Sequence, residues 1–518
     1  MRLNSRLAWL LAGLLLACAL PAAADMDAAK EQLARWQLNN ADLLVDEGKY
    51  MQAVEYIDSA YEISRYPKTR SDALLTRAMV LATFLDAPAE AVATYEQLAG
   101  EFPAYGELAA YRSAFIRMQS GETERARQGF SDYLGRYPDG RFRLQAEAML
   151  ESLGAPSAQP AAPTAPAVAQ KPPVLRVALA RKGGSLSIAA TGPGGVCAEG
   201  MGCAPRVTVT PSGARLSVNG RAVAGGSVSF SSAGPVDVSV GGNGKRVRGD
   251  IRVENRNGRL LVLNLISIED YLLSVVPSES YASWPLETLK AQAVAARTYA
   301  YYQKQHRTGR DYDIVDDTRD QMYGGVLREN GRTTRAVQET AGAVLTYSGK
   351  PILAQYTANS GGFTADSGAV FDAAKPYLVA HEDPASLQGK MASWSKSYTA
   401  AQIVAALKGI GVDAAGLTAI EPAVVGPSGR LVKVRLRHAR GSTVVRTRTT
   451  LASSRVLKLP EVLMRIDREG DRYVFKGKGH GHGVGYSQWG SAELGKRMAH
   501  EKILAFYYPH TSIETLWR

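Results

Sequence analysis

The sequence predicts a multi-domain protein with an all-α domain at the N-terminus, followed by an α+β domain that contains a β-rich subdomain. Helical patterns in the first third of the chain end at Pro67, Pro103 and Pro138, about 35 residues apart. After residue 173, apolar and polar residues alternate between Gly and Asn-Gly turns, which is typical of strands. A long helical pattern then follows at residues 284–303, so strands and helices share this second part of the chain.

The first 24 residues have the pattern of a secretory signal peptide. Two arginines precede an apolar run from Leu7 to Leu20, and Ala22-Ala23-Ala24 offers a cleavage site. The alternative is a lipoprotein box that ends at Cys18, although Leu16 is an unusual residue at its place in such a box. We therefore expect export to the periplasm. After cleavage we expect no transmembrane segment, because no other run is long and apolar enough.

The charge of the chain suits a polyanionic partner. The net charge is +12 and the isoelectric point is near 9.4, which fits nucleic acid, anionic lipid or an acidic cell-wall polymer. Export argues against nucleic acid, so we expect none as a partner.

Residues 25–154 contain three similar helical units, which begin at turns near Gly48, Asp86 and Gly121 and close at a proline. Their period and closing proline are similar to those of tetratricopeptide repeats. Stacked helical hairpins of this kind bury faces that a single hairpin leaves open. We expect a docking surface for a protein partner, with a plain helical spacer as the alternative. Residues 155–172 are rich in Pro and Ala and predict an extended linker to the second domain, residues 173–518.

The β-rich subdomain is expected between Val174 and Ser267. Asn219-Gly220 and Asn257-Gly258 predict tight hairpins. Cys197 and Cys203 lie in one glycine-rich loop, and in an exported protein we expect a local disulfide between them. Two thiols without nearby histidines do not make a zinc site.

The stretch from Val275 to Gln303 places a lone carboxylate, Glu279, in a short polar turn before a dense helical pattern. The helix begins after Trp284-Pro285 and is rich in alanine, so we expect it to be buried. It nevertheless includes Lys290, Gln292 and Arg297. Buried charge is costly unless it is paired, so these groups are expected to meet a partner, a carboxylate or a ligand.

Three motifs in this domain are similar to those of the SpoIID/LytB family. They are Y-L-x-x-V-V-P-S-E with the W-P-x-E-x-L-K-A-Q-A-V-A-A-R-T-Y that follows it, the S-G-G turn at Ser360, and G-H-G-V-G-Y-S-Q-W-G at residues 481–490. The resemblance covers roughly residues 173–518. It implies a lytic transglycosylase that cuts the bond between N-acetylmuramic acid and N-acetylglucosamine in peptidoglycan glycan strands and leaves a 1,6-anhydro-muramyl end. The alternative is a non-catalytic glycan-binding protein that enhances or recruits a cell-wall amidase, as LytB-type relatives are described.

The resemblance implies that Glu279, the glutamate of the V-P-x-E turn, is the catalytic acid. Ordinary glycosidases need two carboxylates, but here the 6-hydroxyl of the substrate attacks, so one carboxylate suffices for both proton transfers. Burial beside Trp284 would raise its pKa enough to keep it protonated. From spacing alone, Glu279 is equally well an acid favoured by the dipole of the following helix.

The remaining candidates are expected substrate contacts in the same groove. They are Lys290, Gln292, Arg297, Tyr323, Ser360, Gly361, His482, Ser487 and Gln488. For Lys290 and Arg297 a buried ion pair is an equal alternative, for Gln292 a structural role is equally open, and for Tyr323 core packing is.

The chain also departs from the family at places where many members have His and Cys, and some of those members bind zinc. Arg319 and Asp320 stand where many members have His and Cys, and Thr357 replaces a histidine often found before the S-G-G turn. His480 and His482 have H-x-H spacing, which alone is a weak metal signal. We therefore expect no metal and no cofactor.

Overall fold

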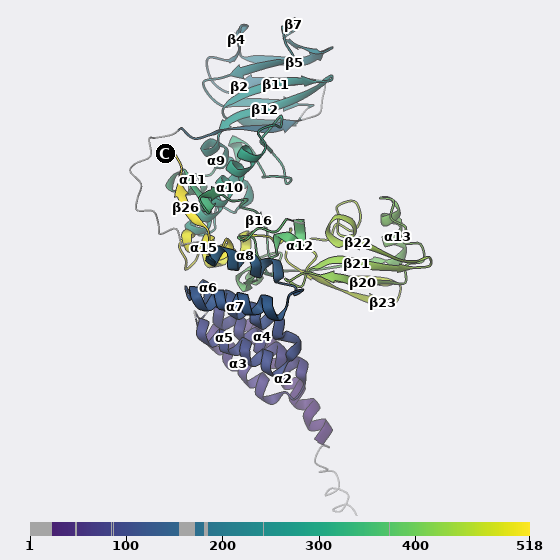
Figure 1. Cartoon of the computed structure of the whole chain (residues 1–518). Coiled ribbons are helices and arrows are strands. Elements are labelled where there is room, and N and C mark those ends of the chain that lie inside the picture. Colours follow the sequence, from purple (N-terminus) through teal and green to yellow (C-terminus); the bar gives the residue numbers. More distant parts are fainter. Residues whose placement is uncertain are drawn as a thin grey trace, which may run out of the picture. The chain divides into compact units, whose positions relative to one another are not determined.

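The computed structural model of the chain describes residues 23–46, 49–83, 85, 87–154, 171–180, 185–241, 243–371 and 373–517. The chain divides into two compact units, Met1–Ala155 and Pro156–Arg518, which Figure 1 colours along the sequence. The predicted signal peptide, apart from its last two residues, and most of the predicted Pro/Ala linker lie outside the described residues.

The first unit is helical, as predicted, and each of its helices packs against the next. The reason is visible in α3, where Ala53, Val54, Ile57 and Ala60 are buried at helical spacing. The helices are α2 (Ala23–Asp46), α3 (Tyr50–Ile63), α4 (Pro67–Thr83), α5 (Pro88–Glu101), α6 (Gly106–Gln119), α7 (Thr123–Arg136) and α8 (Arg143–Gly154). The helical class is thus confirmed, while the tetratricopeptide assignment stays a prediction.

The second unit begins with two sheets that share one apolar core. One sheet has the order β13-β1-β12-β11-β8-β3-β4 and the other β10-β9-β2-β5-β6-β7. Their strands are β1 (Val174–Ala180), β2 (Leu186–Ala190), β3 (Val196–Ala198), β4 (Gly202–Ala204), β5 (Arg206–Ser212), β6 (Arg215–Val218), β7 (Arg221–Ala222), β8 (Ser227–Ser231), β9 (Val236–Val240), β10 (Asn243–Val247), β11 (Asp250–Arg256), β12 (Arg259–Ser267) and β13 (Ile314–Val315). Both predicted Asn-Gly hairpins are present, with Asn219 at φ 48° and Asn257 at φ 56°.

Cys197 and Cys203 face each other across β3 and β4 and form a disulfide. We predict that Cys197→Ser together with Cys203→Ser lowers the free energy of unfolding of this unit by about 2 kcal/mol, because a short closed loop restricts the unfolded chain. Urea denaturation with and without the substitutions measures this. Since the pair lies in the sheet, the function of the folded protein should be unchanged at urea concentrations below the unfolding transition. Equal stability of the two proteins would refute the loop-closure account.

The strand β12 leads directly into two helices at the centre of the unit. The helix α9 (Ile268–Glu279) begins at Ser267, whose side chain accepts a hydrogen bond from the Asp270 amide. It runs through Glu279, so the predicted polar turn at this residue is wrong. The backbone becomes extended only at Ser280. The helix α10 (Leu286–His306) follows Pro285 and is buried on nearly all sides, as its small residues predicted.

The remaining helices and short strands follow α10 in the chain. They are α11 (Gly331–Glu339), β14 (Ala343–Tyr347), β15 (Lys350–Pro351), β16 (Tyr356–Thr357), β17 (Gly362–Phe363), α12 (Ser367–Phe371), β18 (Glu382–Asp383), β25 (Tyr486–Ser487), α14 (Gln488–Leu494), α15 (His500–Tyr507) and β26 (Ser512–Thr515). Of these, α11, β14, β15, α14 and α15 pack against α10. Within the apolar segment Ile352–Thr357, only the two residues of β16 pair with β25. Among the described residues, no helix has the length and hydropathy needed to cross a bilayer.

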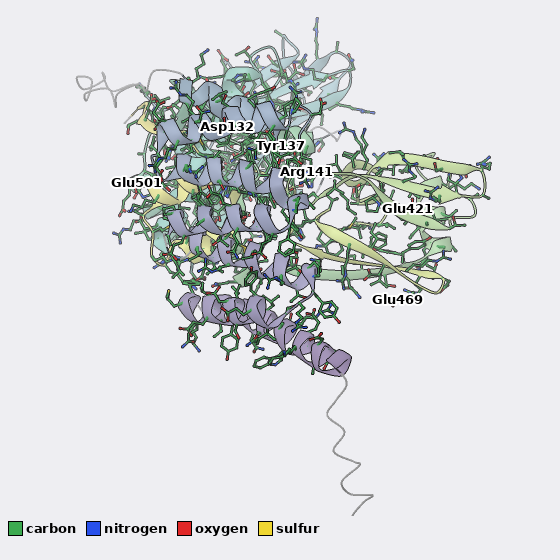
Figure 2. The ribbon with its side chains drawn as sticks, turned by 60° about the horizontal axis from the view of Figure 1, so that its bottom comes forward. Asp132, Tyr137, Arg141, Glu421, Glu469 and Glu501 are labelled. Carbon is green, nitrogen blue, oxygen red and sulfur yellow. A yellow bond between two sulfur atoms is a disulfide. The ribbon has the colours of Figure 1, made fainter. Side chains whose placement is uncertain are left out.

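An inserted subdomain at residues 393–478 has its own apolar core. It contains β19 (Ser393–Thr399), α13 (Ala400–Lys408), β20 (Ala419–Val425), β21 (Leu431–His438), β22 (Gly441–Arg446), β23 (Met464–Glu469) and β24 (Arg472–Lys478). Figure 2 labels Glu421 on β20 and Glu469 on β23. The strands β21 and β22 pair as an antiparallel hairpin.

Candidate active site

Glu279 lies at the C-terminal end of α9, in a cleft of about 500 Å³. Its side chain is half-buried. One carboxylate oxygen accepts a hydrogen bond from the Met322 amide at 2.8 Å, and the other accepts one from the Gln488 side chain at 3.2 Å. The cleft is lined by Pro277, Ser278, Glu279, Ser280, Tyr281, Ala282, Trp284, Met322, Gly324, Arg328, Ala358, Met391, Gln488 and Trp489. Among these described residues, Glu279 is the one carboxylate.

Burial raises the pKa of Glu279 above its ordinary value. Hydrogen bonds from Met322 and Gln488 and the nearby Tyr356 hydroxyl act in the opposite direction, because they favour the ionised form. Within the described structure, the Tyr356 hydroxyl makes no hydrogen bond of standard geometry, yet it is close enough to contribute to this effect. The net result is a carboxyl that holds its proton to a higher pH than a free glutamate does. The hydrogen-bond donors of Met322 and Gln488 are in place to stabilise its ionised form.

Gln292 supports the carboxylate indirectly. It is fully buried on α10, and its side-chain oxygen accepts hydrogen bonds from Gln488 at 3.3 Å and from Ser280 at 3.3 Å. The Gln488 amide therefore bridges Gln292 and Glu279. The side chain of Gln292 does not line the cleft, so it holds Gln488 in place rather than contacting a ligand.

The S-G-G turn at Ser360 and the loop at residues 481–490, which were expected to contact substrate, meet behind this bridge instead. The Ser487 hydroxyl caps α14 by accepting from the Gly490 amide at 3.3 Å, and it also accepts from the Ser360 amide at 3.2 Å. A Cβ at Gly361, which has φ 73°, would lie 2.7 Å from the Lys478 backbone, so glycine permits two backbones to cross here. Ser360, Gly361 and Ser487 thus fix the position of Gln488 without lining the cleft.

Asp383 is a buried carboxyl that the sequence reasoning missed. It accepts hydrogen bonds from Ser360 at 2.6 Å and from Tyr507 at 3.1 Å. Burial raises its pKa to about 7. Because its side chain has no exposure to solvent, it anchors the S-G-G turn rather than meeting a substrate. Its sequence context, a Glu-Asp-Pro after an apolar run, holds no recognised motif that identifies it.

Arg297 is wholly buried and belongs to an ion pair, which corrects its assignment as a substrate contact. Its guanidinium donates to both oxygens of Glu269, at 2.9 and 2.8 Å, and to the Val337 and Ala343 carbonyls. Glu269 in turn accepts from the Trp517 indole at 2.7 Å. This network ties α10 to α9, α11, β14 and the residues after β26.

Three further predicted contacts also lie outside the cleft lining. Lys290 pairs with Glu287 at 2.9 Å and with Glu339 at 2.8 Å, so its ammonium is neutralised by protein carboxylates. The buried Tyr323 donates to Asn264 at 3.0 Å, which is the core-packing alternative. The His482 ring accepts from the Val484 amide at 3.0 Å, and burial with two nearby guanidinium groups lowers its pKa to about 3.

One group in the described structure has the composition of a metal site, namely Glu287, His500 and Glu501. Glu501, on α15, is labelled in Figure 2. Glu287 already pairs with Lys290 and accepts from the His500 amide, and a neighbouring ammonium opposes cation binding. None of the three residues lines the cleft around Glu279, so we assign no metal role there.

An aromatic wall in the cleft was likewise not predicted as such. Tyr281, Trp284 and Trp489 lie in mutual contact. The ring centroids are 5.4 Å apart for Tyr281 and Trp284, 5.7 Å for Tyr281 and Trp489, and 5.0 Å for Trp284 and Trp489. Sequence reasoning placed Trp284 beside Glu279 but missed its two partners. Tyr281 lies in an irregular turn, and Trp489 comes from a helix more than two hundred residues later, so no local pattern joins them.

The comparisons with known proteins concern this same region. The family model "Stage II sporulation protein" (SpoIID) matches residues 256–347, which include α9 and α10, and a domain of unknown function (DUF8618) matches residues 375–485. An uncharacterized protein of Brachyspira hyodysenteriae is 31% identical over 268 residues, covering 51% of this chain and 72% of the relative.

Two named relatives come from Bacillus subtilis. The Amidase enhancer is 31% identical and the alignment covers 47% of this chain and 40% of that protein. Stage II sporulation protein D is 30% identical, covering 48% of this chain and 74% of that protein. Together with the matched motifs around Glu279, these similarities establish that the chain belongs to the SpoIID family.

Proposed function

We propose that residues 173–518 act as a peptidoglycan lytic transglycosylase that cleaves the bond between N-acetylmuramic acid and N-acetylglucosamine. The observation that carries this proposal is the state of Glu279. It is half-exposed in a cleft, its pKa is raised by burial, and it is the one carboxylate among the described lining residues. A single protonated carboxyl is what a reaction with an internal nucleophile requires, whereas hydrolysis ordinarily uses two.

In the proposed reaction Glu279 serves first as acid and then as base. Its proton passes to the glycosidic oxygen as the bond from that oxygen to the anomeric carbon breaks. The Met322 amide and the Gln488 side chain donate to the carboxylate that results. The 6-hydroxyl of the same muramyl ring then attacks the anomeric carbon and gives its proton to Glu279. A 1,6-anhydro ring forms, water is not consumed, and Glu279 regains its starting state.

The second candidate is a non-catalytic enhancer or recruiter of a cell-wall amidase. It is favoured by the similarity to the Bacillus subtilis Amidase enhancer. In that case the cleft would bind glycan strands, and Glu279 would act as a hydrogen-bonding group.

Incubation of the purified chain with peptidoglycan separates the two candidates. The transglycosylase proposal expects anhydro-muramyl products from intact glycan, from peptide-stripped glycan, or from both. Binding to both glycans without any anhydro product would overturn it in favour of the enhancer.

A prediction about Gln488 tests the roles assigned around Glu279. Gln488→Met removes a donor that stabilises the carboxylate, so the pKa of Glu279 should rise further. Activity needs the protonated form and is lost as pH rises through that pKa, so the alkaline limb should move to higher pH. We expect kcat/KM at the optimum to fall about tenfold, the value of roughly one hydrogen bond. The exposed control Gln338→Met should match wild type, and an unmoved alkaline limb would refute the role of Gln488.

We also propose that the chain is exported to the periplasm and that its helical unit binds a protein partner. A cavity of about 470 Å³ on α5, α6 and α7 supports the second proposal. Asp132 and Tyr137, which Figure 2 labels, line it. Sequencing the N-terminus of the mature protein from a periplasmic fraction tests export, and a start at Met1 would contradict it. Crosslinking from residue 132 in cells tests docking, and an absence of any crosslinked protein would contradict it.

A further inference from the structure

The cleft around Glu279 exposes an unusual amount of apolar surface. Tyr281 is 57% exposed, Met391 47% and Met322 39%. Exposed apolar groups gathered around a polar site are typical of ligand-binding surfaces. The half-buried rings of Trp284 and Trp489 extend this surface, so the cleft offers both flat aromatic faces and the flexible thioethers of Met322 and Met391 to a ligand.

The turn that presents the wall is held from behind. Arg332, on α11, donates to the Ala282 carbonyl at 2.8 Å and to the Trp284 carbonyl at 2.9 Å. These two hydrogen bonds fix the backbone between Tyr281 and Trp284. The aromatic wall is therefore positioned before any ligand arrives.

Arg328 lines the same cleft and is exposed. Across the part of the chain that the structure describes, its guanidinium makes no hydrogen bond or ion pair. It is also the one cation among the described lining residues. Its stem passes over Gly324, where a Cβ would lie 2.4 Å from the Arg328 Cγ and 3.0 Å from the Ser278 hydroxyl. Gly324 thus makes room for this side chain at the edge of the cleft.

We propose that the cleft selects carboxylate-bearing glycans: a sugar ring contacts the wall of Tyr281, Trp284 and Trp489 while an acidic substituent of the strand pairs with Arg328. This inference rests on the proposed function only in taking a glycan as the ligand. A guanidinium binds a carboxylate through paired, charge-assisted hydrogen bonds. A neutral N-acetylglucosamine polymer offers the ring but no such acid.

Two sources in peptidoglycan supply this carboxylate. One is the lactyl group of a muramyl residue whose stem peptide has been removed, and the other is an acidic group of the stem peptide itself. Both present the same chemistry to Arg328, so the experiment includes one ligand for each source.

Binding is measured in the full chain with Glu279→Gln, so that the proposed reaction does not consume the ligand. Tryptophan fluorescence and calorimetry follow three ligands: neutral chito-oligosaccharide, peptide-stripped glycan and peptide-bearing glycan. We expect at least one acidic glycan to bind about five- to tenfold more tightly than chito-oligosaccharide. Adding Arg328→Gln should remove that preference and leave chito-oligosaccharide binding unchanged, whereas Arg310→Gln, an exposed matched control outside the cleft, should have no effect.

Two further variants locate the contacts. Gly324→Ala keeps the charge but displaces the Arg328 stem, so it should reduce the preference as Arg328→Gln does. Tyr281→Ala should weaken all three ligands alike. A preference that survives both Arg328→Gln and Gly324→Ala would overturn the assignment of Arg328. Equal affinity of the Glu279→Gln protein for all three ligands would overturn the selection itself. Neither result depends on whether the protein cleaves glycan, since turnover is measured separately with Glu279 intact.

Discussion

Glu279→Gln abolishes the release of anhydro-muramyl products, with turnover reduced about 10²- to 10⁴-fold, the usual contribution of a positioned general acid and base. The amide has nearly the shape of the carboxyl but does not deliver a proton at neutral pH. One oxygen remains to accept from the Met322 amide, so the cleft and glycan binding should persist. Product analysis by mass spectrometry, together with a glycan pull-down, measures both effects.

The control for this substitution is Glu199→Gln, an exposed carboxylate outside the cleft, which should leave product release unchanged. Full activity of the Glu279→Gln protein would contradict the assignment of Glu279.

The same variant should also differ from wild type in the pH dependence of its thermal stability. Because the pKa of Glu279 is raised in the folded state, the wild-type fold loses stability as pH rises from the unfolded pKa through the folded one. The difference in Tm between the variant and wild type should therefore shift in favour of the variant as pH rises through this range. At pH values below the unfolded pKa, this difference should not change with pH.

Arg297→Met lowers the free energy of unfolding of the second unit by about 3–5 kcal/mol, the usual cost of breaking a buried ion pair from one side. The substitution leaves Glu269 without its guanidinium and removes the donor to the Val337 and Ala343 carbonyls. Arg297→Lys should recover only part of the loss, because an ammonium does not reproduce the two-pronged contact. Urea denaturation followed by tryptophan fluorescence measures this, since Trp517 contacts Glu269 directly.

The matched control is Arg335→Met on α11, whose exposed guanidinium pairs with Glu339 on the surface. We expect little change in stability there. If Arg297→Met denatures at the same urea concentration as wild type but is inactive, then Arg297 works on the substrate and the structural role is wrong.

The sequence predicted the elements whose signals are local. The Asn219-Gly220 and Asn257-Gly258 turns, the alternation in the sheets and the alanine-rich α10 were all evident from short patterns. The extent of β16 was not, because its partner β25 lies about 130 residues further along the chain. The helical state of Glu279 was also missed, since α9 continues through Pro277 to Glu279 where a polar turn was expected.

The site residues that belong to sequence motifs were predicted, and those that only the tertiary structure brings together were missed. Glu279 and Gln488 line the cleft, as their motifs indicated. Because α10 is buried almost all round, its pattern did not tell that its polar residues lie outside the cleft lining, and Arg297 points to Glu269. Tyr281 comes from an irregular turn and Arg328 from the short 3₁₀ helix Val326–Arg328. Both segments are too short to show a periodic pattern, so only the folded chain brings them to Glu279.

The most direct test of the proposed reaction is the chemistry of the newly formed ends. Wild-type protein is incubated with intact and with peptide-stripped glycan in ¹⁸O-labelled water, and the products are analysed by mass spectrometry. The account predicts muramyl ends that are one water lighter than hydrolysis products and contain no ¹⁸O, because the substrate's own 6-hydroxyl is the nucleophile. New reducing ends that contain ¹⁸O would show hydrolysis and contradict the role of Glu279 as a lone acid and base, and no new ends on either glycan would contradict catalysis altogether.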